Sequence, residues 1–409
     1  MNKKKIFNDP IYGFLTIPSE LIFDIIDHPI FQRLRRIRQL GLTDLVYPGA
    51  LHTRFHHALG AMHLMGITLD TLQSKGHEIS PEEREAAQIA ILLHDIGHGP
   101  FSHALEYSLL EGVPHESISR LIMQKFNMLL KGKLELTIAM FNNTYHRRFF
   151  HELISSQLDV DRLDYLQRDS FFTGVSEGTI GADRILKMLD LKDDKLVIEE
   201  KGIYSIENFL TARRLMYWQV YLHKTTVSSE KMMISIIRRA KQLTQNGIDI
   251  YAGKTLKIFL QNNVSCSDFE SNTVYLDEFC KLDDFDIWGA IKNWADCEDF
   301  TLSYLCQSLL NRKLFKIQIT DEAPDSDRIE QIKENIISVF GVKADEISNY
   351  LFTGIISNAA YVSKGQNINV LTKKGKVVDV AVASDLPNIK ALGKIVKKQY
   401  LCCPKKVYL

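Results

Sequence analysis

The chain has 409 residues, of which 45% are apolar and 24% charged, as is ordinary for a soluble globular protein large enough for two domains. Lysine plus arginine and aspartate plus glutamate both number 50, so no overall charge directs the chain to nucleic acid. No apolar run is long enough for a membrane span, and the lysines at 3–5 lack the apolar stretch of a signal peptide. We therefore expect a cytoplasmic protein without membrane or nucleic-acid partners.

Histidine and cysteine are distributed differently along the chain. Twelve of the 13 histidines precede residue 152, which places any metal or proton chemistry in the N-terminal half. The cysteines form no C-x-x-C pair, so we expect reduced side chains that mostly pack in the interior. They are Cys266, Cys280, Cys297, Cys306, Cys402 and Cys403.

The first 50 residues predict a short strand over 12–17 and then two helices. Apolar residues recur at helical spacing from 18 to 40, and Pro29 divides this segment. The second helix, 31–40, carries four arginines. Two interpretations remain open, a solvated helix face or an anion-binding helix that faces phosphates.

Residues 52–63 predict the start of a buried helix that carries His57. A single histidine in such a helix is usually a hydrogen-bonded core residue rather than a ligand. Here three histidines and an arginine lie within six positions, which favours a functional site.

The pair His94–Asp95 is the clearest chemical signal in the sequence. Residues 80–83 have the pattern of a helix start with a capping box, and the apolar run 86–93 leads to the pair. A histidine and a carboxylate at the end of a core helix offer a neutral nitrogen and an anionic oxygen, which suit a divalent metal.

More histidines follow within nine residues of this pair. We expect His98 in a loop and His103 on the next helix. Glu106 then lies within hydrogen-bonding reach of His103, because residues three apart are neighbours on a helix.

Residues 159–165 place three carboxylates in six positions. Asp161 shares a helix face with Asp164 or with Tyr165. A cluster this dense in an apolar helix is either linked to a metal or part of a salt-bridge network, and both remain open.

The rest of the chain predicts a loop, several strands and further helices without a catalytic motif. The expected strands are 195–198, 203–206, 314–319, 367–371 and 377–383, and the expected helices are 206–245, several within 255–312, and 326–340.

The candidate metal residues His57, His94–Asp95 and Asp161 are far apart in the sequence. Their order resembles the H…HD…D signature of the HD-domain metal-dependent phosphohydrolases. Further motifs resemble the deoxynucleoside triphosphate triphosphohydrolases, over about residues 5–230 and without the SAM domain of the animal members. These motifs lie at 7–10, 31–35, 39–41, 47–50, 54–57, 94–103 and 159–169.

This resemblance implies a mainly α fold, an HD-domain helical core with small β-hairpins. We expect an HD phosphohydrolase domain over 1–248. A C-terminal α+β accessory region over 249–409 would serve oligomerisation or closure of the site.

The resemblance also implies hydrolysis of a dNTP to deoxynucleoside and triphosphate. A divalent metal (Mg, Mn, Fe or Co) would polarise the α-phosphate and lower the pKa of an attacking water. His103 would donate a proton to the leaving oxygen, held by Glu106. The implied metal ligands are His57, His94, Asp95 and Asp161, and the catalytic group is His98, His103, Glu106 and His115. The resemblance also implies the substrate contacts. These are Arg54, Arg162 and Arg213 for the triphosphate, Gln39, Tyr165 and Asp169 near the 3′ hydroxyl and sugar, Leu40 and Tyr221 at the 2′ position, and Tyr217 on the base side.

Relatives of this type have regulatory nucleotide sites between subunits. Matching positions for a guanine-nucleotide activator are Lys5, Asp27, Gln32 and Arg35, and those for a second nucleotide are Arg184, Lys201, His223 and Lys224. We therefore expect a homotetramer activated by GTP or a dNTP. The alternatives are another HD-type phosphohydrolase, such as a nucleotidase or a GTP-preferring enzyme, and a nucleotide-sensing or nucleic-acid-binding HD protein.

Overall fold

Three helices of the N-terminal half form the frame on which the rest of the chain packs. Helix α3 (Arg54–Ser74) contacts both α4 (Pro81–Leu93) and α9 (Val160–Thr173). Buried residues occur on all sides of α3, because small and apolar side chains surround its axis rather than forming one stripe. A helix of this kind has to be enclosed, so α3 lies in the core.

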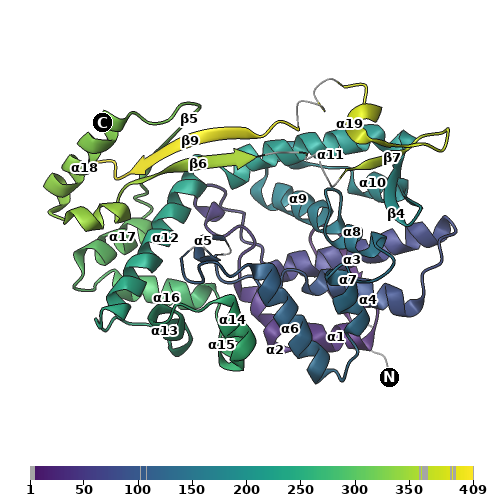
Figure 1. The fold of residues 1–409 in the computed structure, drawn as a ribbon, viewed down its shortest axis with the longest axis horizontal. Helices are drawn as coiled ribbons and strands as arrows, with labels where there is room; N and C mark the ends of the chain where they lie inside the picture. The colour runs from purple at the N-terminus through teal and green to yellow at the C-terminus, as the bar shows by residue number, and fades with distance from the viewer. Residues whose placement is uncertain are drawn as a thin grey trace.

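The computed structural model describes residues 5–101, 103–106, 108–358, 361, 367–386, 389 and 393–408. Helices predominate and the strands form three small sheets, which confirms the prediction of a mainly α fold (Figure 1). No helix within these residues is both long and apolar enough to cross a bilayer. All six cysteines are unpaired.

The remaining elements follow in chain order. The helices before residue 250 are α1 (Glu20–Asp27), α2 (Pro29–Gln32), α5 (His103–Glu106), α6 (His115–Leu129), α7 (Glu135–Phe141), α8 (Phe149–Ile154), α10 (Ala182–Met188), α11 (Ile203–Met216) and α12 (Lys224–Gln245). The later helices are α13 (Lys254–Gln261), α14 (Cys266–Ser271), α15 (Thr273–Phe279), α16 (Asp284–Trp294), α17 (Phe300–Leu310), α18 (Ser326–Phe340) and α19 (Val380–Ala383). The strands are β1 (Ile6–Asp9), β2 (Gly13–Thr16), β3 (Leu189–Lys192), β4 (Lys195–Glu199), β5 (Lys316–Thr320), β6 (Phe352–Asn358), β7 (Asn369–Leu371), β8 (Val377–Asp379) and β9 (Val396–Cys403).

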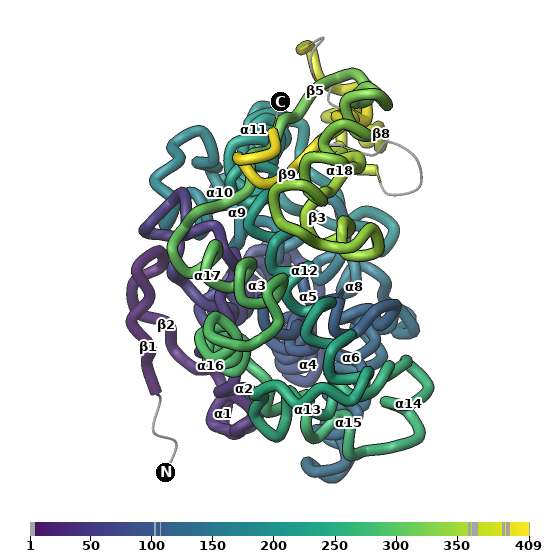
Figure 2. Tube along the Cα trace, turned by 90° about the vertical axis from the view of Figure 1, so that its left-hand side faces the viewer, coloured from purple at the N-terminus to yellow at the C-terminus, as the bar shows by residue number. Residues whose placement is uncertain are grey.

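The sheets join segments that are distant in the sequence. Strands β1 and β2 form an N-terminal hairpin, and β9 lies between β5 and β6 in an antiparallel sheet. In the view of Figure 2 the hairpin lies along the left edge, and the sheet of β5 and β9 lies near the top. The third sheet has the order β3-β4-β7-β8, with β4 and β7 parallel. It combines strands from both sides of residue 248, and the division into two domains there stays a prediction.

The helix start predicted at 80–83 is confirmed in its atomic detail. The Ser80 hydroxyl accepts a hydrogen bond from the Glu83 N–H at 3.1 Å, and the Glu83 carboxylate accepts one from the Ser80 N–H at 2.9 Å. These contacts satisfy two N–H groups that the first helical turn leaves without partners. Helix α4 therefore begins at Pro81 and delivers His94 at its C-terminal end.

The prediction of a second basic helix over 31–40 was wrong. Helix α2 stops at Gln32 and continues only as a 3₁₀ turn through Arg36. The cause is the environment of Arg33, whose fully buried guanidinium donates to the carbonyls of Ile96, His98 and Leu282 at 2.8, 3.1 and 3.0 Å. Arg33 is therefore part of the core, whereas Arg35 and Arg36 are exposed, and an anion-binding role for this segment stays a prediction.

The predicted strand 203–206 is also wrong, because these residues begin α11. Gly202 allows the turn, since a Cβ at this position would lie 2.8 Å from side-chain atoms of Ile198 and Met188. The buried residues that follow, Ile206, Phe209 and Leu210, recur at helical rather than strand spacing.

The single long helix predicted over 206–245 is in fact two helices. A π-helical turn over Tyr217–Tyr221 separates α11 from α12. His223 then takes an extended conformation and its Nδ1 accepts the Thr225 N–H at 3.2 Å, which caps α12. Likewise the predicted strand 377–383 ends at Asp379, because the Asp379 carboxylate caps α19 at the Ala381 N–H, 2.8 Å away.

Candidate metal centre and active site

Helices α3, α4 and α9 each contribute to one cluster of metal-type side chains. His57 comes from α3, His94 from the end of α4 and Asp161 from the first turn of α9. Oδ1 of Asp161 lies 3.0 Å from Nε2 of His57 and 3.3 Å from Nε2 of His94, and Oδ1 of Asp95 is also 3.3 Å from the latter atom. The structure thus brings together the four residues predicted to hold a metal.

The two histidines are oriented as metal ligands are. Nδ1 of His57 is 2.7 Å from Oδ2 of Asp164, and Nδ1 of His94 is 2.6 Å from the Ile91 carbonyl oxygen. Both Nε2 atoms are buried and make no hydrogen bond of acceptable geometry. Ligating histidines in proteins typically direct one nitrogen to the ion and the other to a carboxylate or carbonyl. The residues present therefore fit a divalent cation.

The pKa values of His57 and Asp161 also fit a site for a divalent cation. Burial lowers the pKa of His57, but the carboxylates of Asp161 and Asp164 outweigh burial and raise this pKa to about 10. Burial favours a higher pKa for Asp161, but His57 and His94 hold it well below its usual range. Since metal ligation needs a neutral imidazole, a cation has to compete with a proton for this site.

A buried ion-pair network joins α9 to β1 and packs against α3. Arg168 donates to both oxygens of Asp164, at 2.9 and 3.0 Å, and to Oδ2 of Asp9 at 2.8 Å. Gly60 of α3 permits this approach, because a Cβ there would lie 2.0 Å from Asp164 Oδ1. Of the two interpretations of the acidic cluster, Asp161 fits the metal-linked one and Asp164 the salt-bridge one.

The turn after the His94–Asp95 pair is fixed against α6 by Ser119. The Ser119 hydroxyl donates to the His94 carbonyl at 2.7 Å and accepts the Gly97 N–H at 2.9 Å. A Cβ at Gly97 would lie 2.2 Å from the His115 carbonyl oxygen, so only glycine allows this packing. Ser119 had no predicted role, and no local sequence pattern marks it.

His98 and His115 stack beside the metal-type cluster. Their ring centroids are 3.7 Å apart, and Nε2 of His98 is 3.5 Å from Oδ1 of Asp95. Oε1 of Glu106 accepts the backbone N–H of His115 at 3.0 Å and lies 3.1 Å from its Nδ1. Burial, reinforced by the nearby Arg54 charge, holds the pKa of His98 well below its usual range. His103 begins α5, but its side chain lies outside the described residues.

Comparison with known proteins decides the family. The HD domain model matches residues 54–169 and the HD associated region model matches 180–252. The chain is 34% identical to YwfO of Bacillus subtilis, an uncharacterised protein, over 93% of this chain and 88% of that one. A crystal structure of a phosphohydrolase from Bacteroides thetaiotaomicron is 50% identical, with a TM-score of 0.94, over 98% of this chain and 99% of that one. The chain belongs to the HD-domain phosphohydrolases.

A more distant relative has a more specific name. The deoxynucleoside triphosphate triphosphohydrolase SAMHD1 homolog of Dictyostelium discoideum is 33% identical over 58% of this chain and 50% of its own length. The HD-domain phosphohydrolase described here therefore spans about half of that relative.

Two of the predicted phosphate-binding arginines of this phosphohydrolase are held by carboxylates. Nη1 of Arg54 donates to Oδ2 of Asp95 at 2.5 Å, and Nη1 of Arg162 pairs with Asp159, which caps α9. Arg213 differs, because it is buried and its Nε and Nη1 have no hydrogen-bond partner within the described part of the chain. A buried guanidinium with unused donors is suited to an anionic ligand.

The predicted sugar and base contacts surround a group of tyrosines. The Tyr221 ring packs edge-on against Tyr165 and Tyr217, with centroids 6.3 and 5.0 Å apart, and its hydroxyl donates to Oδ2 of Asp169 at 2.7 Å. Burial and the neighbouring Tyr217 raise the pKa of Tyr165, whereas the Arg162 and Arg213 charges oppose this.

Gln39, Leu40 and His52 lie near this group of tyrosines. Gln39 is half-buried with its Oε1 lacking a hydrogen-bond partner, and Leu40 packs partly buried against the core. His52 was given no role from sequence, yet it is buried, stacks on Phe172 at 4.5 Å and places Nε2 2.7 Å from Oδ1 of Asp169. Its position within the histidine cluster at 52–57 was the available signal.

The residues predicted for the first regulatory site lie in the N-terminal region around α1 and α2. Lys5 lies over the Phe23 ring at 3.6 Å, and Arg35 lies over the Phe55 ring at 3.6 Å and donates to Gln32 at 2.8 Å. Asp27 is exposed at the end of α1.

The four residues predicted for the second regulatory site form two separate pairs. Arg184 donates to the Lys201 carbonyl at 3.4 Å, whereas His223 and Lys224 begin α12. No hydrogen bond or ion pair joins these two pairs within the described residues.

Proposed function

We propose that this HD-domain phosphohydrolase hydrolyses dNTPs to deoxynucleoside and intact triphosphate with a divalent metal. The observation that carries the proposal is Arg213, a buried cation with two unused donor nitrogens in the last turn of α11, a helix that packs against α9. The Tyr165 ring of α9 is 6.5 Å from that of His57, so an anion bound by Arg213 would lie beside the metal-type cluster. The SAMHD1 homologues among the relatives support a dNTP as that anion.

The residues divide the reaction between them. His57, His94, Asp95 and Asp161 would hold the metal, which polarises a phosphoryl oxygen and supplies a hydroxide-like nucleophile when bound. Arg54 and Arg213 would bind phosphate oxygens. Glu106 orients His115 through Nδ1, and His103 would give its proton to the leaving 5′ oxygen.

We further propose that the sugar lies against the tyrosine group. The Tyr221 hydroxyl is fixed by Asp169, and Asp169 is itself held by His52, so this wall is rigid. Tyr221 and Leu40 would leave no room for a 2′ hydroxyl, which selects deoxyribose. Tyr217 would face the base.

Assembly and activation belong to the proposal as well. Under it, GTP or a dNTP binds at Lys5, Asp27, Gln32 and Arg35, and a second nucleotide binds near Arg184, Lys201, His223 and Lys224 in a homotetramer. Oligomer size and turnover measured with and without added nucleotide test this part. Equal values in both conditions would contradict it.

Product analysis tests the reaction itself. The chain is incubated with each dNTP and with GTP under Mg²⁺ or Mn²⁺, singly and in mixtures, and the products are separated. Release of triphosphate supports the proposal, whereas orthophosphate or pyrophosphate indicates another HD-type phosphohydrolase. Salt-sensitive binding of single-stranded nucleic acid without turnover would indicate a binding protein. A His94→Ala, Asp95→Ala variant with full turnover would refute the site.

A further inference from the structure

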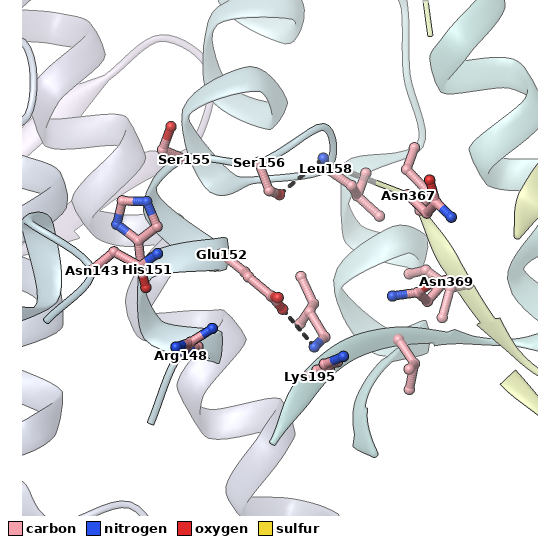
Figure 3. A pocket seen from close by; sticks show the side chains of 14 residues that line it. Asn143, Arg148, His151, Glu152, Ser155, Ser156, Leu158, Lys195, Asn367 and Asn369 are labelled. Carbon is pink, nitrogen blue, oxygen red and sulfur yellow. Dashed lines mark hydrogen bonds between the residues drawn. The ribbon is translucent and has the colours of Figure 1, made fainter. Parts of the chain in front are cut away.

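A cavity of about 500 Å³ lies outside the residues assigned to the active site. Figure 3 shows side chains from α8, from the turn before α9, from the start of β4 and from residues 367–369 around it. None of the predicted metal, catalytic, substrate or regulatory residues lines this cavity. Its volume falls in the range typical of small-molecule sites.

Two parallel strands contribute to one side of the cavity. Strands β4 and β7 pair only at Ile198 with Val370 and at Glu199 with Leu371. The residues before these pairs, on both strands, line the cavity instead. The Glu152 carboxylate accepts the Leu196 N–H at 2.8 Å, which fixes α8 to the first residues of β4 (Figure 3).

The charged groups of the lining favour an anion. Arg148 and Lys195 are exposed cations whose side chains make no hydrogen bond or ion pair within the described residues. The single carboxylate of the lining, Glu152, accepts a backbone N–H, and the two cations exceed its one negative charge. His151 adds a third nitrogen-bearing group, with its Nδ1 3.1 Å from the Met140 carbonyl.

The neutral groups of the lining are mostly hydrogen-bonding side chains. Asn143, Ser155, Asn367 and Asn369 line the cavity, and their side chains make no hydrogen bond within the described residues. Amides and hydroxyls in this number suit a ligand that carries hydroxyl or amide groups in addition to its negative charge.

We propose that this cavity binds a small phosphate ester, such as a sugar phosphate or a nucleoside monophosphate. The guanidinium of Arg148 and the ammonium of Lys195 bind the phosphate, and the asparagine and serine side chains bind the polar remainder. The proposal goes beyond the proposed function, because it assigns a second ligand to residues that the reaction does not use.

The cavity wall is connected to α9, the helix that carries Asp161. Ser156 donates its N–H to Oδ2 of Asp159 at 2.8 Å and accepts the Leu158 N–H at 3.2 Å. Asp159 caps α9 at the Arg162 N–H, 2.8 Å away, in the same helical turn that carries Asp161. A ligand that orders the Ser156 turn therefore also orders the start of α9.

Calorimetric titration tests the site with ribose 5-phosphate, AMP and inorganic phosphate as probes. The double variant Arg148→Ala, Lys195→Ala removes the two cations, and Lys313→Ala, Lys405→Ala removes two exposed lysines elsewhere. We expect the first variant to weaken ester binding by about 100-fold, because each charge-assisted hydrogen bond contributes roughly a factor of ten. The control variant should bind as the wild type does. Phosphate alone should bind more weakly than either ester.

Hydrogen exchange with the same probes locates the ligand without relying on a variant. Slower exchange at 148–158 and 195–199 supports the proposal. Slower exchange confined to 54–57 and 94–98, or ester binding that is lost in His94→Ala, Asp95→Ala but kept in Arg148→Ala, Lys195→Ala, would place the ester in the active site and overturn it. Absence of saturable binding would overturn it too. None of these readouts depends on dNTP turnover.

Discussion

Asp284 accepts a hydrogen bond from the backbone N–H of Phe101 at 3.0 Å, and so joins α16 to the loop that follows His94 and Asp95. Its other oxygen accepts the Arg38 N–H at 2.9 Å. Phe101 has a φ of +50°, a conformation that side chains other than glycine rarely adopt. The region predicted as accessory thus helps to shape the active-site loop, and burial raises the pKa of Asp284 to about 6.

Replacement of Asp284 should therefore affect both folding and turnover. Asp284→Ala leaves two backbone N–H groups without acceptors, which should lower the free energy of unfolding by about 3 kcal/mol. Asp284→Asn keeps one acceptor and should cost less. Urea denaturation measures the stability and steady-state kinetics the turnover, with exposed Asp345→Asn as the control. Wild-type stability and turnover in Asp284→Ala would show that α16 does not support the loop.

Metal affinity should depend strongly on pH. The pKa of His57, about 10 without metal, is above neutrality, so the metal-free centre carries a proton that the cation must displace. Lowering the pH should therefore weaken Mn²⁺ binding, by about tenfold per unit if one proton is released. Calorimetry in buffers of different ionisation enthalpy counts the released protons. An affinity that is constant between neutral and mildly acidic pH would contradict this account of His57.

Asp164 should matter for metal binding although it is not a predicted ligand. It is 2.7 Å from Nδ1 of His57 and fixes the ring so that Nε2 points to the cluster. Asp164→Asn should weaken metal binding by about 10- to 100-fold, as is usual for such supporting carboxylates. Asp190→Asn is a matched control, since Asp190 is 2.6 Å from His77 Nε2 at a distant, partly exposed position. Equal losses of metal affinity in the two variants would mean that the effect is not local.

Two helical glycines should respond oppositely to alanine. In Gly60→Ala the new Cβ meets the Asp164–Arg168 pair at 2.0 to 2.2 Å, so α3 and α9 must separate, at a cost of about 1–3 kcal/mol. Gly289 of α16 has no atom within 4 Å of a Cβ, so Gly289→Ala should stabilise the chain by about 0.5–1 kcal/mol. Thermal denaturation of both variants measures the difference. A Gly60→Ala variant as stable as the wild type would mean that this helix contact is not tight.

The sequence by itself determined the local features of this protein. The capping box at Ser80 and the position of His94 at a helix end depend on residues a few positions apart, so the pattern predicts them. Helix α18 was likewise predicted with its observed bounds, 326–340. The resemblance in motifs gave the family, since those motifs are short contiguous stretches.

Only the tertiary structure decided how distant segments meet. Helical spacing alone marks Asp161 and Asp164 equally, and only the resemblance singles out Asp161. The packing of α9 on α3 turns Asp161 to the histidines and pairs Asp164 with Arg168. Arg33 and its partner Leu282 are 249 residues apart in the sequence, and Phe101 and Asp284 are 183 residues apart. Periodicity reports only which side of an element is apolar, and the partner of a buried polar group is set by the packing of the whole chain.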